Sequence, residues 1–242
     1  MENVVRIDSA KIDDIWKNHI ENPDELNPDE LNPRDNIVDR GYHIEKELPK
    51  GGILFLGMNP SYPKGTENDT KKRTYIRKKD KDTFVYGDSY HVTEKSDGNY
   101  WNKLLETAEK LGESQLCHHD LFFVRERNQA TVLNLIDDAA WKEFFNEQLQ
   151  MSEEIVKAAE PRIIVVVNAG VSNLIKAKHV FGFNPTPYWW EKLGVDMLQI
   201  NGKNTPILFT GMLTGQRAID NGTYNSLMWH INYVLQNENQ YR

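Results

Sequence analysis

The chain has 242 residues, with 36 acidic against 29 basic side chains and a formal net charge of −7. Its single cysteine excludes a disulfide framework and any cluster or zinc site held by several thiolates. The acidic balance argues against a protein that coats nucleic acid non-specifically.

The N-terminal region contains a short repeat, in which Asn-Pro-Asp-Glu-Leu is written twice and begun a third time over residues 22–33. Asn-Pro pairs favour turns, and each proline blocks helix continuation, which predicts a solvated loop. An acidic arm that binds a partner is the alternative. We therefore expect residues 1–47 to form an extension with a helix and this acidic repeat, and residues 48–242 to form one domain.

Apolar patterning predicts alternating strands and helices in the rest of the chain. Residues 53–56 form a short apolar run between glycines, and residues 163–167 are five consecutive β-branched residues, typical of a central parallel strand. Other expected strands are the Leu-Phe-Phe-Val end of residues 116–124, then 197–200 and 207–209. Helical spacing favours residues 101–111, 141–156 (capped by Asp137 or Asp138), 171–178 and 227–235.

This alternation predicts an α/β fold, a three-layer α/β/α sandwich with a short, mainly parallel central sheet. Ligands of such sheets bind beyond the carboxyl ends of the strands. That rule selects three loops, residues 57–81, 125–134 and 210–223.

The first of these loops is strongly basic. Residues 64–81 hold eight basic and three acidic side chains, so the segment carries +5 and the remaining chain −12. Basic side chains mixed with aromatics, here Tyr75 and then Phe84 and Tyr86, suit a polyanion whose bases can stack. A solvated loop is the structural alternative.

The motif Gly57-Met58-Asn59-Pro60-Ser61 directly follows the first strand of the domain, and it resembles the first motif of the uracil-DNA glycosylase superfamily. Three further landmarks occur in the family's order over about residues 48–236: Asp120-Leu121-Phe122-Phe123, the Pro161-led strand with Asn168-Ala169-Gly170 after it, and residues 206–216.

The resemblance implies a flipped base held in a pocket and cleavage of its N-glycosidic bond. Asn59 matches the family's water-positioning asparagine, and Met58 and Pro60 would shape the pocket. Tyr62 is the first candidate to stack on the base, with Phe84 and Tyr86 as alternatives.

The sequence departs from the family at two points. The final family motif supplies a histidine that stabilises the base anion, but no histidine lies in residues 210–223. Thr214, Gln216 or Arg217, or backbone N–H groups of the glycine-rich turn, are the replacements. The family reads its base with an asparagine, whereas Asp120 stands near that place.

An ionised Asp120 would only accept hydrogen bonds, which favours an amino-bearing base over uracil. Asn128 and Asn134 are alternative readers of the base, and pairing of Asp120 with Arg125 or Arg127 is the structural alternative. Leu213 or Met212 is the expected duplex wedge. The expected nucleic-acid contacts are Ser61, Lys71, Lys72, Arg73, Arg77, Gly211, Leu213, Gly215 and Arg217.

The sequence therefore predicts a DNA-binding, uracil-DNA-glycosylase-like hydrolase that needs no cofactor and no metal. His118-His119 beside Cys117 fits no standard metal spacing, because neighbouring strand residues face opposite ways. A cytoplasmic protein with no membrane partner is expected, because the N-terminus lacks a secretion signal and no run of ~18 apolar residues occurs. The alternatives are a catalytically silent nucleic-acid or nucleotide binder of the same fold, and a small-molecule hydrolase or transferase acting on a phosphorylated substrate.

Overall fold

The computed structural model describes residues 4–21, 41–60, 99–126, 128–177, 187–215 and 218–241. The Asn-Pro-Asp-Glu-Leu repeat and the basic segment lie outside the described residues. The strands are β1 (Val4–Arg6), β2 (Glu47–Pro49), β3 (Ile53–Gly57), β4 (Cys117–Asp120), β5 (Ile163–Val166), β6 (Tyr188–Trp190), β7 (Val195–Ile200) and β8 (Lys203–Phe209). The α-helices are α1 (Ser9–Trp16), α4 (Asn99–Lys110), α5 (Gln129–Ile136), α6 (Lys142–Ala159), α7 (Ala169–Lys176) and α8 (Asn221–Gln236).

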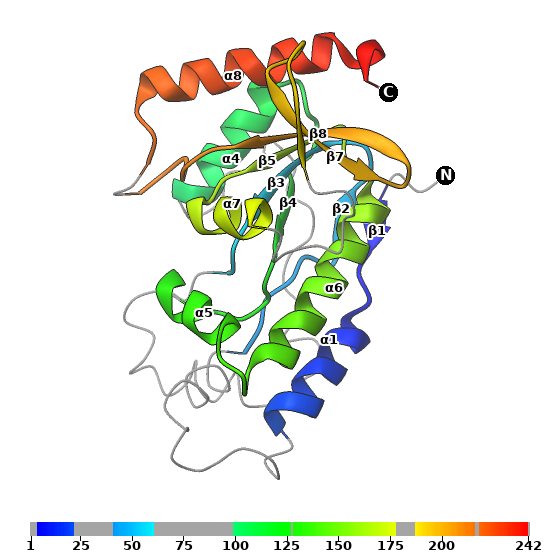
Figure 1. Ribbon diagram of the computed structural model, residues 1–242, viewed down its shortest axis with the longest axis vertical. Helices are drawn as coiled ribbons and strands as arrows, with labels where there is room; N and C mark the ends of the chain where they lie inside the picture. The colour runs from blue at the N-terminus through cyan, green and yellow to red at the C-terminus, as the bar shows by residue number, and fades with distance from the viewer. Residues whose placement is uncertain are drawn as a thin grey trace.

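A six-stranded sheet in the order β4-β3-β5-β8-β7-β6 forms the centre of the molecule (Figure 1). The pairs β3–β4, β3–β5 and β5–β8 are parallel, whereas β7 pairs antiparallel with both β8 and β6. The β7–β8 hairpin turns at Asn201 and Gly202, both with positive φ, as a tight reversal requires. The mostly parallel sheet confirms the expected fold class.

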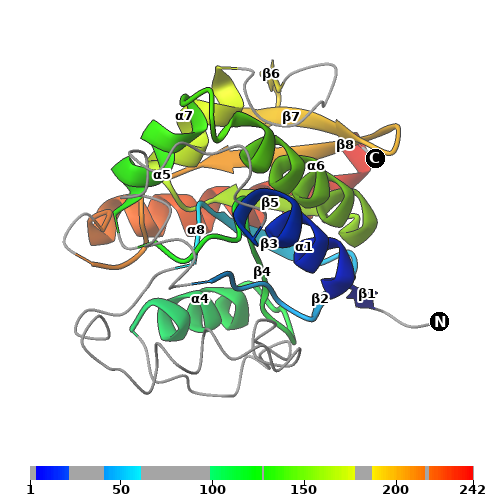
Figure 2. The same cartoon turned by 90° about the horizontal axis from the view of Figure 1, so that it is seen from below.

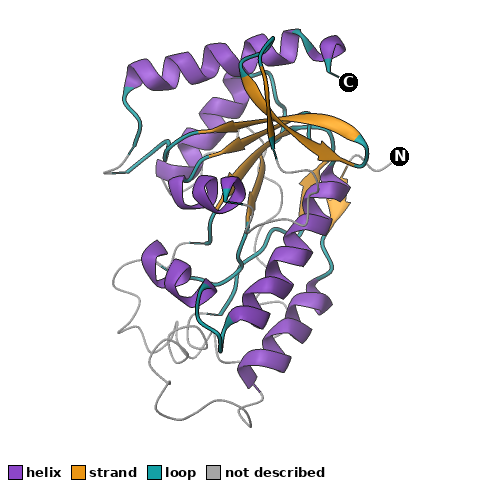
Figure 3. Ribbon diagram, viewed as in Figure 1, coloured by secondary structure: helices purple, strands orange, loops and turns teal. Residues whose placement is uncertain are grey.

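Alternate residues of the central strands enter two separate cores. Leu54, Leu56, Ile164 and Val166 pack with α1, α5, α6 and α7, whereas the residues between them pack with α4 and α8. Figures 2 and 3 show these helices on opposite faces of the sheet. Because both faces are covered, the strands are continuously apolar, which is why the sequence shows no polar alternation there.

The N-terminal segment packs into the same body as the domain. β1 pairs antiparallel with β2, so the boundary expected between residues 47 and 48 falls inside a strand. Ile12, Ile15 and Trp16 of α1 belong to the larger core, and the Trp16 ring lies edge-on to Phe144 of α6 at 5.0 Å.

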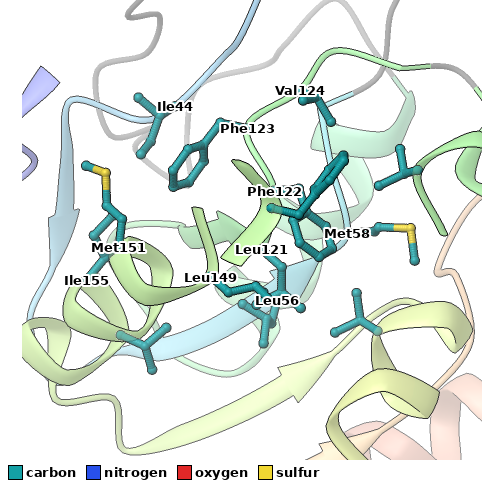
Figure 4. Close-up of a cluster of buried hydrophobic side chains, with 14 of the residues drawn as sticks. Ile44, Leu56, Met58, Leu121, Phe122, Phe123, Val124, Leu149, Met151 and Ile155 are labelled. Carbon is teal, nitrogen blue, oxygen red and sulfur yellow. The ribbon is translucent and has the colours of Figure 1, made fainter. Parts of the chain in front are cut away.

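The strand expected at the end of residues 116–124 is displaced toward the N-terminus. β4 ends at Asp120, and Leu121–Val124 continue as buried, non-strand chain (Figure 4). The buried Gln148 of α6 holds this segment, because its Oε1 accepts from the Phe123 backbone N–H at 2.8 Å. Burial accounts for the apolar run, and the strand-type pairing of this segment is an isolated antiparallel bridge between Val124 and Tyr42.

One local expectation was wrong. Neither Asp137 nor Asp138 caps α6, since Asp137 ends α5 and Asp138 accepts from the Ala140 backbone N–H, so that α6 begins after Trp141 without a side-chain cap. Trp189 lies in β6 and is 60% exposed.

The aromatic cluster between α6 and the Leu121–Val124 segment should dominate stability. Phe145→Ala removes a ring that is 1% exposed and packs edge-on against Phe122, so we expect unfolding free energy to fall by about 3–5 kcal/mol in urea denaturation. Asn146→Ala, at the next and exposed position of α6, is the control and should change it by less than about 0.5 kcal/mol. Equal losses in the two variants would contradict this packing.

Candidate functional site

A cavity of about 570 Å³ lies at the carboxyl ends of the parallel strands. All three loops selected from the sequence reach it, since its walls include Asn59 after β3, Asp120 and Arg125 at the end of β4 and beyond, and Thr214 after β8. The complete lining is His43, Gly57, Met58, Asn59, Pro60, Tyr100, Trp101, Asp120, Arg125, Glu126, Gln129, Val167, Asn168, Met212, Thr214 and Gly215.

Asn59 is held by its amide nitrogen. Nδ2 donates to the backbone oxygen of Glu126 at 2.7 Å and of Pro60 at 3.1 Å, with the Val124 oxygen at 3.4 Å. These three acceptors fix which end of the amide is nitrogen. Oδ1 is left buried without a hydrogen-bond partner among the described residues, although a buried carbonyl oxygen normally has one.

Asp120 lies opposite Gly57 in the β3–β4 register, and its carboxyl group covers that glycine. A Cβ on Gly57 would lie 2.0 Å from Asp120 Oδ1, so only glycine leaves room for the carboxyl group in this position. Oδ1 is 3.8 Å from Nε2 of His118, too far for a hydrogen bond. The same Nε2 lies 3.2 Å from the Tyr100 hydroxyl.

Burial controls the charges of these groups. It raises the pKa of Asp120 to about 8, with the carboxylate of Glu45 adding to the effect, and it lowers the pKa of His118 to about 3. Near pH 6 both groups are therefore neutral and form no ion pair. The raised pKa of Asp120 favours the protonated carboxyl group, which donates as well as accepts, over the acceptor-only carboxylate expected from the sequence.

Neutral His118 can accept the Tyr100 hydroxyl proton at Nε2, which leaves its own proton on Nδ1. This arrangement links α4 to β4 beneath the cavity. Trp101 packs edge-on against the same imidazole at 4.7 Å. Both aromatic residues line the cavity.

Asn168 closes the wall at the end of β5. Its side chain is buried, and its Oδ1 accepts from the Val171 backbone N–H at 3.1 Å, which caps α7. A Cβ on Gly170 would lie 2.3 Å from the end of Met58, so this glycine lets α7 approach the loop after β3. Sequence reasoning named Asn168 only as part of a landmark and gave it no role in the site.

The loop after β8 contributes Met212, Thr214 and Gly215, the last with φ +88°. Leu213 is 5% exposed and packs into the core with α4 and α8, so its side chain is not placed to act as a duplex wedge. Gly211 does not line the cavity, and its nearest side chain beyond its chain neighbours is Ile219.

The remaining candidates lie elsewhere. Asn128 caps α5 through its Oδ1, and Asn134 is exposed on the same helix, so neither lines the cavity. Asp120 and Arg125 both line the cavity. The candidates outside the described residues are Ser61, Tyr62, Lys71, Lys72, Arg73, Arg77, Phe84, Tyr86, Arg127, Gln216 and Arg217.

His118 and His119 face opposite ways, as a strand requires. His118 contacts Tyr100 and Trp101, whereas His119 lies 3.1 Å from the Ser152 hydroxyl on the other face. Among the residues that the structure describes, no three His, Cys, Asp or Glu side chains are grouped to hold a metal ion. Nor does any helix there have the length and apolarity needed to cross a bilayer.

Comparisons with models of protein families, with curated proteins and with solved structures returned no match to this chain. The resemblance to uracil-DNA glycosylases therefore rests on the Gly57–Ser61 motif and on the order of the other landmarks. The geometry of the cavity is the independent ground for assigning a function.

The orientation of the Asn59 amide is testable through stability. Asn59→Asp would place an acceptor against three carbonyl oxygens, and its folded-state pKa should be raised because only the protonated form can donate there. We expect unfolding free energy to fall by about 1–3 kcal/mol, more at pH 8 than at pH 5, since stability is lost as the new carboxyl group ionises. Asn59→Ala is the control without a titrating group. Equal urea stability of the two variants at pH 8 would contradict the arrangement.

Proposed function

We propose that the cavity binds a nucleobase flipped out of DNA and that the protein hydrolyses its N-glycosidic bond. The observation that carries the proposal is Asn59, whose amide nitrogen is tied to three backbone oxygens while Oδ1 has no partner. An acceptor fixed in this way is suited to hold one water molecule by one of its protons. The lone pair of that water is then directed at the sugar carbon.

The shape of the cavity supports a planar aromatic ligand. Its volume of about 570 Å³ falls within the range of small-molecule sites. Tyr100 and Trp101 supply aromatic surface, and Met58, Val167 and Met212 supply apolar surface. A base placed among these side chains is removed from water, which strengthens every hydrogen bond that holds it.

The polar groups of the wall meet the needs of glycoside hydrolysis. Thr214, in the loop after β8, lines the cavity and offers a hydroxyl group to the departing base. Asp120, at the end of β4, offers a carboxyl group. Asn59, Asp120 and Thr214 come from three strand ends, and one cavity brings them together.

DNA as the carrier of the base is supported by the sequence. The basic residues 64–81 begin four positions after Pro60, which lines the cavity. Binding that depends on this segment should weaken steeply as salt concentration rises, because phosphate contacts release counterions.

The test is base release from duplex and single-stranded oligonucleotides that each carry one deaminated, oxidised or alkylated base. We expect release from at least one substrate, and Asn59→Ala should slow it by about 10²-fold or more while leaving most of the DNA affinity. Asn134→Ala, which removes an exposed amide outside the cavity, is the matched control and should leave the rate unchanged.

Three outcomes discriminate the alternatives. Salt-dependent DNA binding without base release from any substrate would favour a catalytically silent binder. Hydrolysis or transfer of a small phosphorylated compound, without DNA binding, would favour the small-molecule enzyme. An unchanged rate in Asn59→Ala would remove Asn59 from the mechanism.

A further inference from the structure

Asp120 occupies an enclosed position between two cavities. Its carboxyl group lies across Gly57 and faces the main cavity, with 14% of the side chain exposed. Behind it lies a much smaller cavity, which Asp120 lines together with Glu45, His43 and His119. The carboxyl group can therefore meet a ligand on one side only.

The carboxylate of Glu45 is the charge that acts on Asp120, and its Oε1 lies 3.6 Å from Nε2 of His43. Glu45, from the segment before β2, is buried, and its Oε2 has no hydrogen-bond partner among the described residues. His118, on the same strand, is neutral and turned toward Tyr100. The titratable and charged groups that face Asp120 or share a cavity wall with it are His43, Glu45, Tyr100, His118, His119, Arg125 and Glu126.

This enclosure favours the neutral acid. Removal from water and the negative charge of Glu45 both oppose ionisation of Asp120, in keeping with its pKa of about 8. Neutral imidazoles at His118 and His119 offer no compensating positive charge, because burial lowers the pKa of each to about 3. A carboxyl group that holds its proton at neutral pH can give that proton to a ligand.

We propose that Asp120 is the general acid of the proposed glycosidic cleavage: its carboxyl group, seated over Gly57 and facing the cavity that holds Asn59, protonates the departing base. This inference rests on the proposed function. It also explains how the reaction could proceed without a histidine in the loop after β8. If Asp120 on β4 protonates the base, no base anion forms that this loop would have to stabilise.

The step balances with water as the sole co-reactant. The bond between the sugar C1′ and the base nitrogen breaks, and its electron pair leaves with the base. The Asp120 proton passes to a basic atom of the base. The water at Asn59 Oδ1 adds its oxygen to C1′ and releases one proton, which returns to the Asp120 carboxylate. The products are the free base and the sugar hydroxyl.

The test is single-turnover base release by the full chain, on the substrate that the wild-type protein cleaves best, as a function of pH and of leaving group. We expect the wild-type rate to fall as pH rises through about 8, because the proton donor is lost. Asp120→Asn should be slower by about 10²–10⁴-fold and should lose this alkaline limb. The loss should shrink for a ring-fluorinated analogue of the same base, which leaves more readily without protonation.

Three further variants separate catalysis from folding. Gly57→Ala keeps the carboxyl group but displaces it, so it should also slow release, whereas Gly52→Ala, just before the same strand, should not. Asp196→Asn changes another aspartate whose pKa is raised by burial, on β7 and outside the cavity, and should leave the rate and the pH profile unchanged.

The outcomes distinguish this inference from the proposed function. If the wild-type protein releases a base and Asp120→Asn does so at the same rate with the same pH profile, the general-acid role is overturned and the glycosylase function stands. An equal loss for the fluorinated and unmodified bases would likewise overturn proton donation. If the wild-type protein releases no base from any substrate, the proposed function fails and the inference fails with it.

Discussion

The burial of β3 on both faces and both edges is the constraint on which the rest of the structure depends. All five of its residues are buried, and β4 and β5 pair with it in parallel on either side. Because β3 lies between β4 and β5, the chain that leaves β3 passes between the ends of these two strands. The main cavity lies at that place. The Gly57–Pro60 turn lines this cavity, and it contains Asn59, whose Oδ1 has no hydrogen-bond partner among the described residues.

The sequence predicted the elements that burial alone specifies. The apolar runs of β3 and β5 and the helical spacing of α4, α6 and α8 each indicated one element, and their alternation indicated the three layers. The predictions of secondary structure that failed concern segments in which burial and strand pairing favour different structures. Leu121–Val124 is as apolar as a strand, yet it leaves the sheet: Leu121 still donates to the Gly57 carbonyl of β3, whereas Val124 bridges Tyr42. The pairing of β1 with β2 depends on contacts between distant residues.

The site was predictable where it follows from strand ends. Asn59, Asp120 and Thr214 were singled out through the resemblance to uracil-DNA glycosylases, and Asn59 and Thr214 also lie in loops that the strand-end rule selects; all three line the cavity. His43 and the aromatic pair Tyr100–Trp101 carry no such signal in the sequence, since they reach the cavity from segments outside the selected loops. The ionisation of Asp120 was equally hidden, because it depends on Glu45 and on enclosure, which no local pattern records.

The walls of the cavity come from positions between His43 and Gly215, on both faces of the sheet. Parallel pairing of this kind brings together residues far apart in the chain, and such long-range closure is slow relative to local helix formation. During synthesis, the residues after β8 emerge after the other walls of the cavity, so the cavity cannot be completed until they have left the ribosome. A truncated or partly folded chain would then present the Asn59 loop without its opposite wall, which couples any activity of this site to complete folding.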